Sequence, residues 1–409
     1  MRARAARDIG KSGDPSAVPA LAGVLTDPSE KVRREAIVAL SSIRVPESLD
    51  PLISATRSTD PKDRVLAVQA LVGYYTGQTP SVGFTGLVKK TWRRAKSHFG
   101  GENLRIDPGV QVEPKVISAL IATMNDPRAA DASRKAAEGL GILVAAAAVP
   151  DLVKAAHSSD KDLALEALDA LTKIIDRSAG PQLIDLLDSV YDEIKQEAAV
   201  TLGILRTSQA LPKLQAMYEN NPDKRTREKA LEGLAYLGDP VSVPLFVKAL
   251  WSAENPIRTS AAEGLARARD AKALPDLEKA VHVEKDGEAR LAMQFAITAL
   301  GKEDFLSTIV TDLGSRLRGD SAQAYLIELS RDKAFLARLY PYTSSTDATV
   351  RRRLCTVLMY SGDQTSLEQL ERLSHDPNGE VASAALRAAR AIRVRVSSPS
   401  PAPAAKAGL

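Results

Sequence analysis

Four histidines and a single cysteine are the side chains of this 409-residue chain best suited to acid–base, metal-binding or nucleophilic chemistry. The histidines are far apart in the sequence, at His98, His157, His282 and His375. Motifs for zinc proteases, paired cysteines, phosphate-binding loops and serine hydrolases are all absent. The sequence therefore predicts no catalytic residue, metal, cofactor or small-molecule substrate. Cys355, in the apolar helical text RRRLCTVLMY, is expected to be a buried, inert thiol.

Basic residues give the strongest chemical signal. Segment 76–112 holds six Lys and Arg against two acids, and this +4 equals the net charge of the whole chain. Within it, the phrase LVKKTWRRAKSHF (87–99) has helical spacing and is bracketed by glycine and proline. It predicts a basic amphipathic helix whose apolar side carries aromatic residues. The candidate partner-binding residues are Lys89, Lys90, Trp92, Arg93, Arg94, Lys96 and Phe99.

Three interpretations of residues 87–99 remain open. Trp92 and Phe99 can dock on the chain's own helices while the cations stay solvated. Alternatively, the cations can meet an acidic protein or peptide partner. The third is weak contact with an anionic membrane surface, with the tryptophan at the headgroups. The first two are compatible, because a docked helix still displays its charges.

The rest of the chain is a repeat that must position this segment. Apolar pivot positions recur in steps of 30 to 32 residues, except for one step of 69 that contains the basic segment. The pivots are Leu40, Leu71, Leu140, Leu171, Leu202, Leu234, Leu265, Ile297, Ile327, Leu358 and Ala389. Apolar residues around each pivot have helical spacing. One such helix pair cannot bury its apolar stripe alone, so neighbouring units must stack.

Proline and glycine mark the predicted helix boundaries. The first helix of each pair is expected to begin near a proline, at positions 19, 51, 150, 181, 212, 244 and 275. Pairs such as Asp27-Pro28, Asp60-Pro61, Asp126-Pro127 and Asp376-Pro377 are expected to cap and open the second helix. Left-handed glycines before aspartate are expected to end helices at Gly13, Gly238 and Gly362.

The recurring phrase Gly-Asp-x-x-x-Val-Pro-x-Leu, Asp-Pro and Val-Arg-x-x-Ala-x-x-Ala-Leu resembles HEAT repeats of the phycobilisome-lyase type. The resemblance covers nearly the whole chain. It implies an all-α fold, a right-handed α-solenoid of roughly eleven to twelve HEAT-like helix pairs at a 31-residue pitch. In such families, recurring Asp and Arg residues form a ladder between repeats. Asp27 with Arg33, and Asp347 with Arg351, are examples of that pattern here.

The predicted organisation has four parts. Residues 1–75 are N-terminal repeats whose first unit is truncated, and 76–112 are the insertion. Residues 113–393 continue the same solenoid, with degenerate repeats at 302–342, and 394–409 form a disordered Pro/Ala/Ser tail. Because Met1 aligns with Val32, inside a second helix, we expect the true start to lie upstream. The sequence as it stands predicts a cytoplasmic protein, exported if a signal sequence precedes it.

The predicted function is a non-catalytic scaffold for protein–protein interaction, with 87–99 as its partner-specific element. The family resemblance implies one alternative, an enzyme or enzyme subunit of the bilin-lyase kind. A lesser alternative is peripheral association of the basic helix with an anionic membrane or nucleic acid. HEAT-like DNA glycosylases need a basic, aromatic-bearing groove, whereas the chain outside the insertion sums to zero charge, which argues against nucleic acid.

Overall fold

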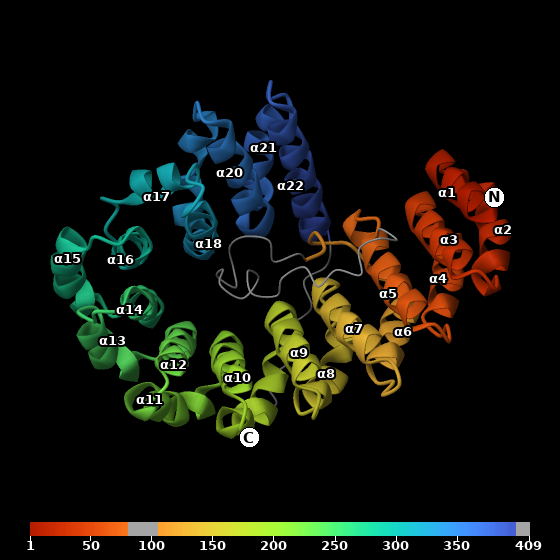
Figure 1. Cartoon of the computed structure of the whole chain (residues 1–409). Helices are drawn as coiled ribbons and strands as arrows, with labels where there is room; N and C mark the ends of the chain where they lie inside the picture. The colour runs from red at the N-terminus through yellow and green to blue at the C-terminus, as the bar shows by residue number, and fades with distance from the viewer. Residues whose placement is uncertain (81–104, 398–409) are drawn as a thin grey trace, which may run out of the picture. The chain divides into compact units, whose positions relative to one another are not determined.

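The structure is a computed structural model that describes residues 1–80 and 105–397. Within these ranges the chain is built of α-helices and short 3₁₀ helices, and no β-strand occurs (Figure 1). The described residues form two compact units. Unit 1 comprises 1–80, 105–106 and 110–273, and unit 2 comprises 107–109 and 274–397. The protein is an all-α solenoid, as predicted.

Unit 1 consists of two parallel rows of helices. The second helices of successive pairs form one row: α1 (Arg2–Ser12), α3 (Glu30–Ile43), α5 (Pro61–Thr76), α7 (Ala130–Ile142), α9 (Lys161–Ile174), α10 (Asp192–Ile204), α12 (Lys224–Leu237) and α14 (Asn255–Ala268). The first helices form the other: α2 (Val18–Gly23), α4 (Leu49–Ala55), α6 (Pro114–Met124), α8 (Val149–Ala156), the 3₁₀ helix η6 (Arg177–Asp188), α11 (Leu211–Asn220) and α13 (Val243–Ala249).

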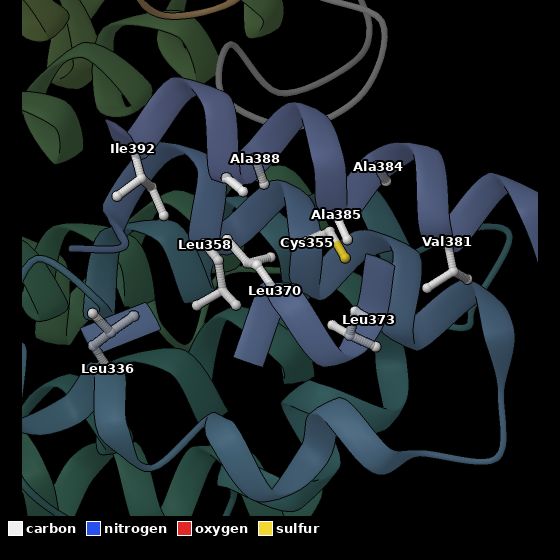
Figure 2. Packing of buried hydrophobic residues seen from close by; sticks show 11 residues of the cluster. Leu336, Cys355, Leu358, Leu370, Leu373, Val381, Ala384, Ala385, Ala388 and Ile392 are labelled. Atoms are coloured by element: carbon white, nitrogen blue, oxygen red, sulfur yellow. The ribbon is translucent and has the colours of Figure 1, made fainter. Parts of the chain in front are cut away.

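Unit 2 is less regular. It contains α15 (Leu274–Val283), α16 (Gly287–Ala299), α17 (Leu306–Asp312), α18 (Gly319–Leu329), α19 (Lys333–Ala337), the 3₁₀ helix η10 (Tyr340–Ser344), α20 (Ala348–Ser361), α21 (Leu367–Ser374) and α22 (Gly379–Ser397). Figure 2 shows the core between α20, α21 and α22, where Leu358, Leu370 and Ile392 point toward one another. Cys355 lies in this core and is fully buried, as predicted, and burial raises the pKa of its thiol to about 12.

The pivot residues form the core of each pair. All of them are buried except Ile327, which is partly exposed. In α18 the fully buried residues are Ala322 and Leu326 instead, so the predicted register is wrong by one residue there. The error falls in the degenerate stretch, where α19 and η10 take the place of a single first helix. Elsewhere the apolar period sets the buried face correctly.

Prolines lie near the start of the first helices, as predicted, but short 3₁₀ helices precede several of these helices. Pro19, Pro150, Pro212 and Pro244 stand at the second position of α2, α8, α11 and α13. Each of these α-helices follows directly on a short 3₁₀ helix that the sequence did not predict. Pro181 lies inside η6, which stays 3₁₀ throughout.

The Asp-Pro pairs act differently from the prediction. Of these four pairs, Asp60-Pro61 alone caps an α-helix that begins with proline, α5. α3 begins at Glu30 with Ser29 as its N-cap, and the Asp27 carboxylate instead accepts the Ser29 N–H at 2.8 Å. Asp126 and Asp376 do the same to the residue two positions on. The aspartate thus closes an Asx turn ahead of the helix, and proline occupies the turn.

The helix ends also depart from the glycine rule. Gly13 and Gly238 are left-handed as predicted, with φ of 67° and 63°. Gly362 is extended, with φ of −65°, so the prediction is wrong at this position. Among the described residues, five others adopt positive φ although they are not glycine. This conformation costs more free energy for a β-branched side chain than for others. They are Arg44, Val144, Ile175, Arg206 and Arg269.

The predicted Arg–Asp ladder exists, but its partners come from neighbouring repeats. Arg33 does not pair with the Asp27 carboxylate; its guanidinium contacts Asp60 at 3.0 Å and Asp63 at 2.5 Å in the next unit. Arg64 contacts Asp126 at 2.7 Å. The same Arg33 guanidinium also donates to the Asp27 backbone carbonyl at 3.0 Å. Arg33 therefore ties its own interhelix loop to the following repeat, and Arg351 does the same in unit 2.

Candidate interaction surface

The predicted site residues Lys89, Lys90, Trp92, Arg93, Arg94, Lys96 and Phe99 lie outside the described residues, as does His98. The described flanks of their segment are well defined. On the N-terminal side, α5 ends at Thr76 and Gly77 is left-handed with φ of 80°. The Tyr75 hydroxyl on α5 accepts the backbone N–H of Glu113 at 3.0 Å. The two sides of the insertion are therefore joined directly.

On the C-terminal side, the chain runs across the ends of two second helices of unit 1. Ile106 donates its backbone N–H to the carbonyl of Ile142, the last residue of α7, at 3.0 Å. The Arg105 guanidinium donates to the carbonyls of Thr172, at 3.2 Å, and of Lys173, at the end of α9. A cation at these carbonyls is favoured because they carry the negative end of the helix dipole.

Stacking also bypasses the insertion. A Cβ on Gly139 of α7 would lie 2.6 Å from Val72 Cγ2 of α5, so the two helices pack closely although the insertion separates them in sequence. The salt bridge between Arg64 and Asp126 spans the same step. The segment is therefore added to a repeat stack that is already continuous within unit 1.

A row of charged side chains recurs on the second helices of unit 1. One carboxylate stands two residues before the pivot in four of them, and each forms an ion pair with a cation of its own helix. The pairs are Glu138–Lys135 at 2.5 Å, Asp169–Lys173 at 2.5 Å, Glu232–Lys229 at 2.6 Å and Glu263–Arg267 at 3.1 Å. In the sequence these residues appear only as a mixture of positive and negative charges. The row could have been predicted from the recurrence of an acid at the same repeat position.

At the centre of this row, neighbouring carboxylates stabilise the charged form of Lys229. Burial alone would lower the pKa of the Lys229 ammonium, but the carboxylates of Glu232 and Glu197 outweigh burial and raise that pKa. Arg267 lies over the Tyr236 ring, 4.5 Å from its centroid. These groups hold charge of both signs in fixed positions, which suits electrostatic recognition of a partner better than proton transfer.

Two of the described histidines lie at helix ends. His157 and His375 are the C-cap residues of α8 and α21, at the ends of first helices as predicted. His157 Nδ1 lies 2.9 Å from the Val153 carbonyl, and its Nε2 lies 3.1 Å from Asp185. Among the residues that the structure describes, no group of three His, Cys, Asp or Glu side chains is placed to hold a metal ion. None of the described helices has the length and apolarity needed to cross a bilayer.

Comparison with known proteins identifies the repeat. A family model described as HEAT repeats matches residues 1–72, 149–235 and 211–300, which together make up more than half of the chain. A search of curated proteins gives no match. Among solved structures, an engineered protein is 18% identical, covering 92% of this chain and 98% of that one, with a TM-score of 0.42.

Two further solved structures are similar at comparable levels. Importin beta is 14% identical, covering 93% of this chain and 53% of its own, with a TM-score of 0.48. The complex of CpcE and CpcF of phycocyanin lyase from Nostoc is 21% identical, covering 62% and 94%, with a TM-score of 0.36. At these identities the likeness concerns the fold alone.

Proposed function

Because the chain belongs to the HEAT-repeat family, we propose that it acts as a non-catalytic scaffold that binds a protein or peptide partner. Residues 87–99 are the partner-specific element in this proposal, and the partner is acidic. The supporting observation is that both flanks of the segment are bonded to unit 1, through Tyr75 and Arg105, while the repeats stack without it. Because both flanks are bonded to unit 1, a partner captured by the segment would be held close to the repeats.

The proposal includes the division of the chain by role. Residues 1–75 and 113–393 form the stack in this proposal, 76–112 are the recognition insert, and 394–409 are a tail without a binding role, although residues 394–397 still belong to α22. The phycobilisome-lyase type of repeat, and with it attachment or removal of bilin, is the competing assignment. An absorbance spectrum of the purified protein mixed with bilin distinguishes the two, because a covalent or tight bilin adduct shifts the chromophore band.

The test of the scaffold is capture of a partner by the full chain. The variant K89E/K90E/R93E/R94E is expected to keep its circular dichroism and melting temperature but lose the partner identified by mass spectrometry. The matched control K11E/K31E/R57E/K62E reverses four exposed cations of unit 1 and should still capture it. If both variants captured the partner equally, residues 87–99 would not be the partner-binding element.

Lipid contact is tested separately with tryptophan fluorescence. Trp251 is half exposed, so the W251F variant leaves Trp92 as the single reporter. If the segment meets a protein partner rather than lipid, emission should stay unchanged when anionic vesicles are added. A blue shift with vesicles would favour the membrane interpretation instead.

A further inference from the structure

The second helices of unit 1 stack through small residues that point to the following repeat. A Cβ on Gly141 of α7 would lie 2.7 Å from Ala170 Cα of α9. A Cβ on Gly203 of α10 would lie 2.2 Å from the Gly233 carbonyl oxygen of α12. Both glycines directly follow a pivot leucine. The position after the pivot therefore faces the next unit, and a small residue there lets the two backbones approach closely.

The last described helix, α22, has a large charged residue at the position after its pivot. The residue after its pivot is Arg390, which is exposed. Three residues before the pivot, where α20 has the fully buried Cys355, α22 has Leu386 with 58% of its surface exposed. The ladder arginine of α20, Arg351, is replaced by Ala382. Leu386 is thus exposed at a position where Leu168 of α9 and Leu231 of α12 are fully buried.

The same side concentrates positive charge around an apolar centre. We call it the forward face and define it as Leu386, Arg387, Arg390 and Arg393, all of them exposed. Within the described part of the chain, Arg387 and Arg390 have neither a hydrogen-bond nor an ion-pair partner. Arg393 has a loose contact of 3.9 Å with Glu371, and both side chains are largely exposed. The carboxylate of α22 itself, Glu380, stands in its first turn.

The opposite side of α22 is firmly packed. Val381, Ala385, Ala388 and Ile392 are fully buried against α20 and α21 (Figure 2). The helix is therefore held rigidly and presents the forward face without needing to refold. A partner that binds there pays little conformational entropy for ordering the receptor helix. Only the arginine and leucine side chains must be fixed on binding.

We propose that the forward face of α22 docks an acidic segment of a protein partner, with an apolar side chain on Leu386 and carboxylates on the arginines around it. Guanidinium groups bind carboxylates through two parallel N–H donors, which fixes orientation as well as charge. The exposed leucine favours a peptide over nucleic acid, because a phosphate backbone offers no apolar group to cover it. The surface belongs to unit 2 and goes beyond the proposed role of residues 87–99.

The experiment uses the full chain carrying K89E/K90E/R93E/R94E, so that binding by the inserted segment does not contribute. The probe is a fluorescent 16-residue peptide with glutamates around regularly spaced leucines, and its anisotropy reports binding. Adding R387E/R390E/R393E should weaken binding by roughly tenfold or more, and L386A by about threefold. Adding the control set K31E/R57E/K62E, which makes the same change of charge in unit 1, should leave the affinity unchanged.

All variants should keep the parent's circular dichroism, because exposed positions without partners contribute little to stability. The proposal is overturned if the parent does not bind the peptide, or if the forward-face and control variants lose affinity equally. It is also overturned if duplex DNA or phosphatidylserine vesicles bind the parent more tightly than the peptide does. Because the parent lacks four cations of the inserted segment, none of these results bears on the role proposed for residues 87–99.

Discussion

Arg351, seven residues before the pivot of its helix, makes two kinds of contact. Arg351 donates to the Ser345 and Thr346 carbonyls of its own interhelix loop, at 2.7 and 3.1 Å. Its other nitrogens contact the Asp376 carboxylate of the next repeat, at 2.7 and 3.0 Å. Asp376 is 6% exposed, and the hydrogen bonds from Arg351 hold its pKa below the usual range. The pair is a structural link, because a catalytic group would not recur from unit to unit.

Replacing Arg351 by Met should destabilise unit 2 by about 1–3 kcal/mol at pH 7, since the largely buried Asp376 carboxylate loses both guanidinium donors and keeps only the Asn378 N–H. The folded pKa of Asp376 lies below its unfolded value, so this contribution is present above the unfolded pKa and lost as pH falls through the folded pKa. The urea midpoints of wild type and variant should therefore converge as the solution is acidified from pH 5 toward pH 2.

Arg352→Met is the matched control for this experiment. Its guanidinium lies 3.8 Å from Glu380, which is 82% exposed, and such surface pairs contribute little. The urea midpoint of this variant should stay close to that of wild type at every pH. A larger loss from Arg352→Met than from Arg351→Met would contradict the assignment of the ladder.

Close packing between two helices of this protein depends on small residues at the point where the helices cross. α10 and α12 meet through Gly203 and Gly233, and α12 in turn approaches α10 through the Ala199 carbonyl, 2.3 Å from a Cβ built on Gly233. Neither helix has room for a larger side chain at this crossing. Glycine lowers helix propensity, but here the packing of two helices outweighs that cost. The sequence alone shows two glycines inside helices without saying which of them is needed.

Gly203→Ala is expected to lower the stability of unit 1 by about 1–3 kcal/mol, because the added methyl collides with the backbone of α12. Gly23→Ala is the control, since no atom lies within 4 Å of a Cβ there. That variant should match wild type or melt slightly higher, as alanine favours the helix. Thermal melts followed at 222 nm measure both, and similar melting temperatures for the two variants would refute the tight crossing.

Within unit 1 each repeat contacts its neighbours, so an addition between two repeats need not interrupt the stack. α5 and α7 pack directly, although segment 81–104 separates them in sequence. The repeats themselves divide between unit 1 and unit 2 at Ala273 and Leu274, and residues 107–109 of the insertion belong to unit 2. Structure and recognition should therefore be separable in this protein.

Replacing residues 81–104 by a Gly/Ser linker of equal length should leave helicity and the melting temperature of the full chain nearly unchanged. Capture of the partner should be lost, because the cations of the segment are gone. A linker that retains only Lys89, Lys90, Arg93 and Arg94 at their positions is the control, and it should restore part of the capture. A large drop in melting temperature would mean that the segment stabilises the stack.

Local periodicity determined most of the fold from sequence alone. Leu40, Leu140 and Leu358 are buried as the pitch of the repeat predicts, because apolar spacing along a helix fixes which side faces its neighbours. Cys355 could be recognised as a core thiol for the same reason. The basic segment could be located because its charge stands out in the chain, but its spacing identifies no partner.

Tertiary structure alone decided which groups meet. Asp60 belongs to the unit of Arg64 in sequence, yet it contacts Arg33 and Arg34 of the preceding repeat, because stacking offsets each loop by one unit. The exposed Leu386 and Arg390 follow the same helical period as buried residues of other second helices, and only the tertiary structure shows that they are exposed. A sequence period records which side of a helix is packed, whereas contact partners depend on the geometry of the stack.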